Sequence, residues 1–195
     1  MGPRVGTKEP RLPLLVALSR WRVNLGFAAG LVALVACGHP TARAVAGWLP
    51  LVLVGLGLRV WARGHLVLRT RLADSGPYAF VRHPLYVGSF FAGLAFTLMM
   101  HDAWIAVLYV TGFFVMYVPK ALREEAHLRK LYGAEYERYA ARVGAVVPRI
   151  AAFRDRDATN GRFAWPQVLR HREYETWLGA AAACGVLLVR AVWFA

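Results

Sequence analysis

Long apolar segments alternate with short basic segments along this chain of 195 residues. A transmembrane helix needs about 20 predominantly apolar residues, so an apolar segment near that length is a candidate span. Five segments qualify, several of them at the short end of the range: residues 23–38, 44–61, 85–100, 103–118 and 176–194. The pattern predicts an all-α fold, a polytopic membrane bundle of about five transmembrane helices.

A further helical segment is amphipathic and directly follows the fourth apolar segment. Between residues 119 and 143, bulky side chains recur at spacings of four, four, three and four, which places them on one face of a helix. They are Leu128, Tyr132, Tyr136, Tyr139 and Val143. We therefore expect an amphipathic helix on the cytosolic side of the membrane.

The basic residues set the orientation that we predict. Lysine and arginine number five before the first apolar segment, then one, four, none and twelve in the successive connections. Cytosolic loops are enriched in these residues, so the N-terminus and both basic loops should be cytosolic. The chain has 24 Lys and Arg against 11 Asp and Glu. Because these charges flank apolar segments and form no separate polar domain, we expect a lipid bilayer and no nucleic acid as partner.

The domain organisation that we expect is a single unit. Residues 1–150 would form the membrane core, and residues 151–195 a linker and a last transmembrane helix that belongs to the same unit. With only two cysteines, Cys37 and Cys184, the sequence excludes a disulfide framework and a cysteine-based zinc site. The sequence leaves the oligomeric state open.

Residues 75–86, just before the third apolar segment, combine a turn, cations and a helix start. Gly76-Pro77 is a turn signal, and Pro84 suits the first turn of a helix. The N-terminus of that helix would offer free N–H groups and a partial positive charge to a carboxylate or phosphate, with Arg82 and His83 beside it. The alternative is a basic and aromatic anchor at the membrane boundary, which we favour for Arg82 taken alone.

Two acidic residues, Glu124 and Glu125, begin the amphipathic segment. Glu125 lies on its apolar stripe, and a carboxylate there is unfavourable unless it meets a cation or hydrogen-bond donors. The alternative is that both residues only complement the N-terminus of the helix, where acidic side chains are favoured.

A third candidate element is Gly55, Gly57 and Arg59 in the second apolar segment. The two glycines would let a bulky cofactor approach the backbone, but ordinary close packing of membrane helices is the interpretation that we favour for them taken alone. Arg59 and Arg63 lie one turn apart and could either extend to the interface or meet an anionic group.

Together these residues resemble the isoprenylcysteine carboxyl methyltransferase family, which is related to the membrane phospholipid N-methyltransferases. The resemblance covers about residues 55–148. It depends on Gly76-Pro77-Tyr78, on residues 82–88, on Glu124-Glu125 and on the tyrosine-rich residues 131–139.

The resemblance implies an S-adenosyl-L-methionine pocket between the third helix, the fourth helix and the amphipathic helix. Because methyl transfer is an in-line displacement, we expect no metal. If the resemblance holds for the site, the methionine part of the cofactor would be held by His83, Tyr86 and the backbone at Pro84 and Leu85. Glu124 and Glu125 would meet its ammonium or its ribose hydroxyls, and Tyr78 would line the pocket. We expect Arg82, Glu125 and Arg59 at the reacting groups and Gly55 and Gly57 beside the cofactor.

The expected reaction is an in-line methyl transfer, for which a protein mainly supplies proximity and alignment. The acceptor could be a prenylcysteine-type carboxylate, a thiol, a lipid amine or another lipophilic or small molecule. A non-catalytic scaffold protein and a small transporter are the alternatives. Arg172 and Glu173, before the last apolar segment, could close the pocket or orient the substrate, although a charged helix boundary is the simpler interpretation.

Overall fold

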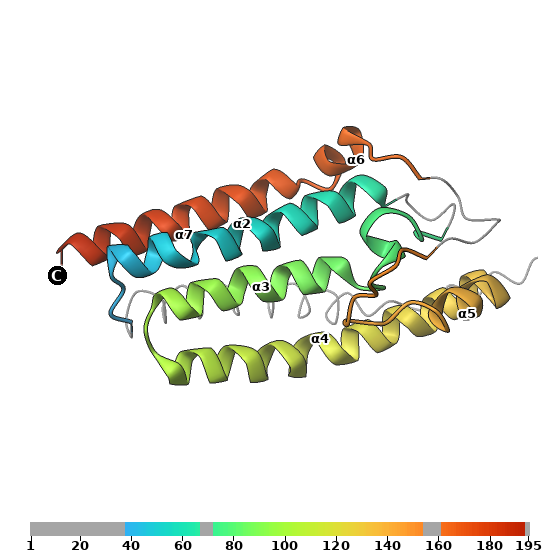
Figure 1. The fold of residues 1–195 in the computed structure, drawn as a ribbon, viewed down its shortest axis with the longest axis horizontal. Helices are drawn as coiled ribbons and strands as arrows, with labels where there is room; N and C mark the ends of the chain where they lie inside the picture. The colour runs from blue at the N-terminus through green and yellow to red at the C-terminus, as the bar shows by residue number, and fades with distance from the viewer. Residues whose placement is uncertain (1–37, 67–71, 154–160, 194–195) are drawn as a thin grey trace, which may run out of the picture.

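The computed structural model describes residues 38–66, 72–153 and 161–193 (Figure 1). The first predicted span, residues 23–38, lies outside them except for its last residue. The described elements are α2 (Ala42–His65), the 3₁₀ turn η1 (Gly76–Ala79), α3 (Pro84–Met99), α4 (Ala103–Tyr132), α5 (Ala134–Ala140), α6 (Trp165–Arg170) and α7 (Glu173–Trp193). Across these ranges the only β contact is an isolated bridge between Val81 and Gly144, so the predicted all-α fold is confirmed.

Three of these helices, α2, α4 and α7, are long and apolar enough to cross a membrane. They correspond to the second, fourth and fifth predicted spans. The third predicted span is α3, which is apolar but has only 16 residues. A total of five spans therefore stays a prediction.

The helices lie side by side in the order α7, α2, α3 and α4 (Figure 1). A buried cluster on three of them forms the core of the bundle and includes Val52 and Leu56 of α2, Ala95 and Met99 of α3, and Leu187 of α7. The C-terminal end of α2, η1, the N-terminal end of α3 and α6 lie at one end of the bundle (Figure 1). This end holds most of the residues that the sequence singles out.

Helix α4 differs from the prediction in length. It continues without a break through Pro119 to Tyr132, so the fourth span and the start of the amphipathic segment are one helix of 30 residues. Asp102 caps its N-terminus by accepting hydrogen bonds from the N–H groups of Trp104 and Ile105. Glu124 therefore lies far from any helix start, and the interpretation of the two glutamates as N-terminal acids is wrong.

The amphipathic segment is also divided. Gly133 has a φ of 52°, a left-handed conformation that glycine adopts readily, and it separates α4 from α5. The prediction that one amphipathic helix continues to residue 143 is therefore wrong. The stripe itself survives the break, because Tyr136, Tyr139 and Val143 form a buried cluster with Leu128 and Tyr132 packed against it.

Candidate functional site

The backbone around Arg82 is held by the chain that follows α5. The N–H of Arg82 donates to the carbonyl of Gly144 at 2.9 Å, and the N–H of His83 donates to that of Ala145 at 3.2 Å. Further along, the N–H of Phe153 donates to the carbonyl of Ala79 at 2.8 Å. These bonds fix residues 79–83 in front of α3 without using their side chains.

Tyr78, just before these residues, is buried, and α5 holds its backbone in position. Its carbonyl accepts a hydrogen bond of 2.8 Å from the hydroxyl of Tyr139. Burial raises the pKa of the Tyr78 and Tyr139 phenols above their ordinary range, so both stay protonated and Tyr139 remains a donor. The tyrosine stripe thus supports the segment that precedes α3.

His83 and Glu125, 42 positions apart in the sequence, are in contact. His83 Nε2 lies 3.0 Å from Glu125 Oε1, and Arg82 Nη2 lies 3.3 Å from the same oxygen. Arg129, one turn further along α4, is 3.6 Å from the other oxygen. The Glu125 side chain is 8% exposed, so this buried carboxylate has the cationic partners that its position requires.

Tyr86 and Glu124 form a second, more open contact beside the first. The Tyr86 hydroxyl donates to Glu124 Oε2 at 2.7 Å, and its ring stacks on the His83 ring with 5.4 Å between centroids. Lys120 Nζ lies 5.2 Å from the centre of the Tyr86 ring, and the Tyr117 ring packs edge-on against it. Glu124 is exposed, so it can still accept a hydrogen bond from a ligand.

The N-terminus of α3 offers fewer donors than the sequence suggests. Pro84 has no N–H, and the N–H groups of Tyr86 and Val87 already donate to the carbonyl of His83, both at 3.1 Å. The N–H of Leu85 has no partner within its own helix. Nε of Arg82 is buried and has no hydrogen-bond partner among the described residues. These two donors can meet an anionic group.

The two glycines of α2 lie in different surroundings. A Cβ atom on Gly55 would lie 2.6 Å from the carbonyl oxygen of Gly88 and 2.7 Å from the nitrogen of Ala92, whereas a Cβ on Gly57 would meet nothing within 4 Å. Gly55 therefore serves the close approach of α2 and α3, the packing interpretation, and leaves no room there for a cofactor. Gly57 faces away from α3, toward α6 and α7.

Arg59 lies on the α3 side of α2, in contact with two other helices. Its Nη1 donates to the Ser89 hydroxyl, and its Nε donates to Glu173 Oε1 at 2.6 Å. Arg63 binds the other oxygen of Glu173 at 3.2 Å. Glu173 begins α7 as a charged helix boundary would, but it is 2% exposed and therefore no surface charge, whereas Arg172 is exposed and pairs with Glu175 at the surface. Ser89 was not among the residues predicted from the sequence.

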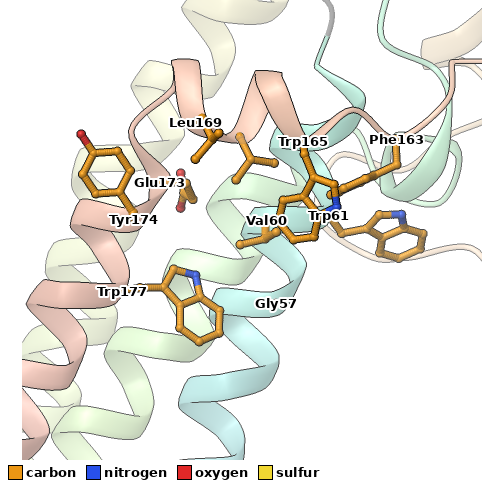
Figure 2. Close-up of a pocket in the computed structure, with 10 residues that line it drawn as sticks. Gly57, Val60, Trp61, Phe163, Trp165, Leu169, Glu173, Tyr174 and Trp177 are labelled. Carbon is orange, nitrogen blue, oxygen red and sulfur yellow. The ribbon is translucent and has the colours of Figure 1, made fainter.

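An apolar groove of about 440 Å³ opens between α2, α6 and α7 (Figure 2). Half of the residues that line it are aromatic. They include Trp61 of α2, Trp165 of α6 and Trp177 of α7, with Phe163 beside them and Glu173 at the α6–α7 corner (Figure 2). The groove adjoins the same end of α2 as the contacts of Arg59. Sequence reasoning missed it because residues far apart in the chain build it.

No group of three or more His, Cys, Asp or Glu residues stands where it could hold a metal ion in residues 38–66, 72–153 and 161–193.

Comparison with known proteins assigns this arrangement to a family. The family model described as phospholipid methyltransferase matches residues 48–135. The nickel-cobalt-cadmium resistance protein of Alcaligenes xylosoxydans xylosoxydans is 31% identical over 154 residues, which are 73% of this chain and 71% of that protein. The chain belongs to the phospholipid methyltransferase family. The resemblance to membrane methyltransferases is thereby confirmed.

Two further relatives illustrate the range of proteins that the chain is similar to. The cobalt-zinc-cadmium resistance protein of Cupriavidus metallidurans is 29% identical over 145 residues, 69% of this chain and 64% of that protein. The protein-S-isoprenylcysteine O-methyltransferase of Schizosaccharomyces pombe is 32% identical over 79 residues, 40% of this chain and 34% of that protein. No solved structure matches the chain significantly.

Membership in the phospholipid methyltransferase family implies S-adenosylmethionine as the usual methyl donor. The matched residues run from α2 to the start of α5 and contain the contacts of His83 and Tyr86 with α4. They end before α6 and α7, so Glu173 and most of the groove lie outside the family match. The spans, the apolar composition and the family together make this a membrane protein.

Proposed function

We propose that this protein transfers a methyl group from S-adenosylmethionine to a lipophilic acceptor at the cytosolic membrane face. The observation that carries the proposal is the meeting of two distant segments at one end of the bundle. The contact of His83 with Glu125 and the contact of Tyr86 with Glu124 lie side by side there. They bring cations, a free carboxylate oxygen and aromatic faces within the reach of one small zwitterion.

The polar and aromatic groups of this site match the charged parts of the cofactor. Its carboxylate suits Arg82 Nε, which has no hydrogen-bond partner among the described residues, and the N–H of Leu85, which has none within its own helix. Its ammonium or its ribose hydroxyls suit Glu124, and its positive charge suits the Tyr86 and Tyr117 rings. Glu125 already has two arginines and His83 as partners, so we propose that it holds Arg82 and His83 in place rather than binding the ligand alone.

The reaction requires alignment more than acid–base chemistry. When bound, S-adenosylmethionine supplies an electrophilic methyl group on a sulfonium. The protein would hold an acceptor atom in line with that methyl group, and such positioning can provide a large part of a rate enhancement. A site with little water also favours the neutralisation of charge when the nucleophile is anionic, and the dispersal of the sulfonium charge in the transition state when it is neutral.

A lipophilic acceptor is supported by the groove. Its almost wholly apolar lining suits a hydrocarbon body, and its outer wall continues into the exposed apolar face of α7, which includes Leu178, Val189 and Val192. Because α7 is long enough to span the membrane, an acceptor could enter from the bilayer. The names of two relatives refer to resistance to metals and specify no reaction, so we take no substrate from them.

Transfer of labelled methyl groups tests this function. The purified protein is incubated with methyl-labelled S-adenosylmethionine and a native membrane extract, and the products are separated into lipid and water-soluble fractions. We expect label in the lipid fraction, and its loss with Arg82→Ala because that cation faces the proposed cofactor site. Label that appears only in water-soluble molecules would contradict the lipophilic acceptor, and no label in any fraction would contradict the enzyme.

A further inference from the structure

Glu173, the first residue of α7, brings a buried carboxylate to the side of α2. One oxygen accepts from Arg59 Nε at 2.6 Å and the other from Arg63 Nε at 3.2 Å. A carboxylate that is 2% exposed is strongly unfavourable unless such partners meet it. Buried ion pairs seldom add net stability over apolar residues, so this group needs a reason beyond holding α7 in place.

The direction of the Arg59 side chain supplies that reason. Its stem crosses the glycine gap in α3, since a Cβ on Gly88 would lie 2.8 Å from Arg59 Cγ. Its Nη1 then reaches the Ser89 hydroxyl, which donates to the carbonyl of Leu85 at 2.8 Å. A chain of contacts thus runs from Glu173 through Arg59 and Ser89 to the first turn of α3, where Tyr86 meets Glu124.

The same carboxylate also stands at the edge of the aromatic groove (Figure 2). Glu173 is therefore placed between the space that we assign to the acceptor and the helix turn that we assign to the cofactor. Both of its carboxylate oxygens pair with arginines, so Glu173 has no unpaired charge with which to bind a ligand.

We propose that Glu173 is a positioning residue, which fixes the Arg59 guanidinium between the two sites and so makes α7 part of the functional unit. This inference rests on the methyl transfer proposed above. It predicts that loss of the Glu173 charge impairs transfer and leaves cofactor binding intact, because no atom of Glu173 faces the contacts of His83 and Tyr86 with α4.

The test compares Glu173→Gln with Glu175→Gln in the full-length protein. Glu175 lies two residues along the same helix, is 52% exposed and pairs with Arg172 at the surface, so it is a matched control. S-adenosylhomocysteine affinity is measured by calorimetry, and methyl transfer with the labelled cofactor and the native membrane extract. We expect both variants to bind like the wild type, but transfer by Glu173→Gln to fall about a hundredfold, as for reacting groups misplaced by about 1 Å.

Ser89→Ala is the second variant, since it loosens the same guanidinium without leaving a buried charge unpaired. It should also slow transfer, and its effect should not add to that of Glu173→Gln, because both changes release one side chain. Transfer by Glu173→Gln at the rate of the control, or full additivity of the two changes, would overturn the inference. A wild-type protein that neither binds S-adenosylhomocysteine nor transfers label would instead overturn the proposed function.

Discussion

Replacing Glu125 by Ala should weaken S-adenosylhomocysteine binding by about 1.5–3 kcal/mol, the range for hydrogen bonds to charged groups. The Glu125 carboxylate is the common partner of Arg82, His83 and Arg129. Without it, these three side chains lose the group that orients them, and Arg82 no longer presents its Nε in a fixed direction. Calorimetric titration of the variant and the wild type in the same detergent measures the difference.

Glu135→Ala is the control for this change, because Glu135 is an exposed acidic residue in the first turn of α5. It should bind the ligand like the wild type. Glu125→Gln adds a case that keeps the shape of the side chain and removes its charge. If both Glu125 variants are folded and bind with unchanged affinity, the carboxylate only supports the structure.

The Gly55→Leu variant should lose about 3 kcal/mol of unfolding free energy, at the upper end for overpacked cores. The new Cβ would lie 2.6 Å from a backbone oxygen and 2.7 Å from a backbone nitrogen of α3, and backbone atoms cannot rotate away. The two helices would have to separate. Thermal unfolding in detergent, followed by circular dichroism, measures the loss.

Gly57→Leu is the matched control, since a Cβ at this position meets nothing within 4 Å. It should unfold at the temperature of the wild type or slightly above, because leucine has a higher helix propensity than glycine. Equal effects of the two leucines would mean that α2 and α3 do not pack as closely as described.

Much of the fold follows from local sequence pattern. Hydrophobic length located α2, α3 and α7 to within a few residues of their ends. The same pattern stopped the fourth helix near Val118, because Pro119 and the charges after it resemble a boundary. The helix continues through Pro119 instead, so Glu124 and Glu125 lie inside the last third of a long helix. A proline in a membrane helix is tolerated where neighbouring groups satisfy the freed carbonyl, which a local pattern does not reveal.

The candidate site was also predictable only in part. The motif residues His83, Tyr86, Glu124 and Glu125 are recognisable in the sequence, and the structure brings them into contact. The pairing of Arg59 with Glu173 could not be predicted, because Glu173 lies 114 positions away and resembles an ordinary charge before a helix. The glycine pattern left two interpretations open, and only the backbone of α3 distinguished Gly55 from Gly57.

A structure of the protein with bound S-adenosylhomocysteine tests the central claim most directly. The ligand should lie between the first turn of α3 and the part of α4 around Glu124, with its carboxylate near Arg82 and a polar group within hydrogen-bond distance of Glu124. A ligand bound elsewhere, for example in the groove between α2, α6 and α7, would contradict the account.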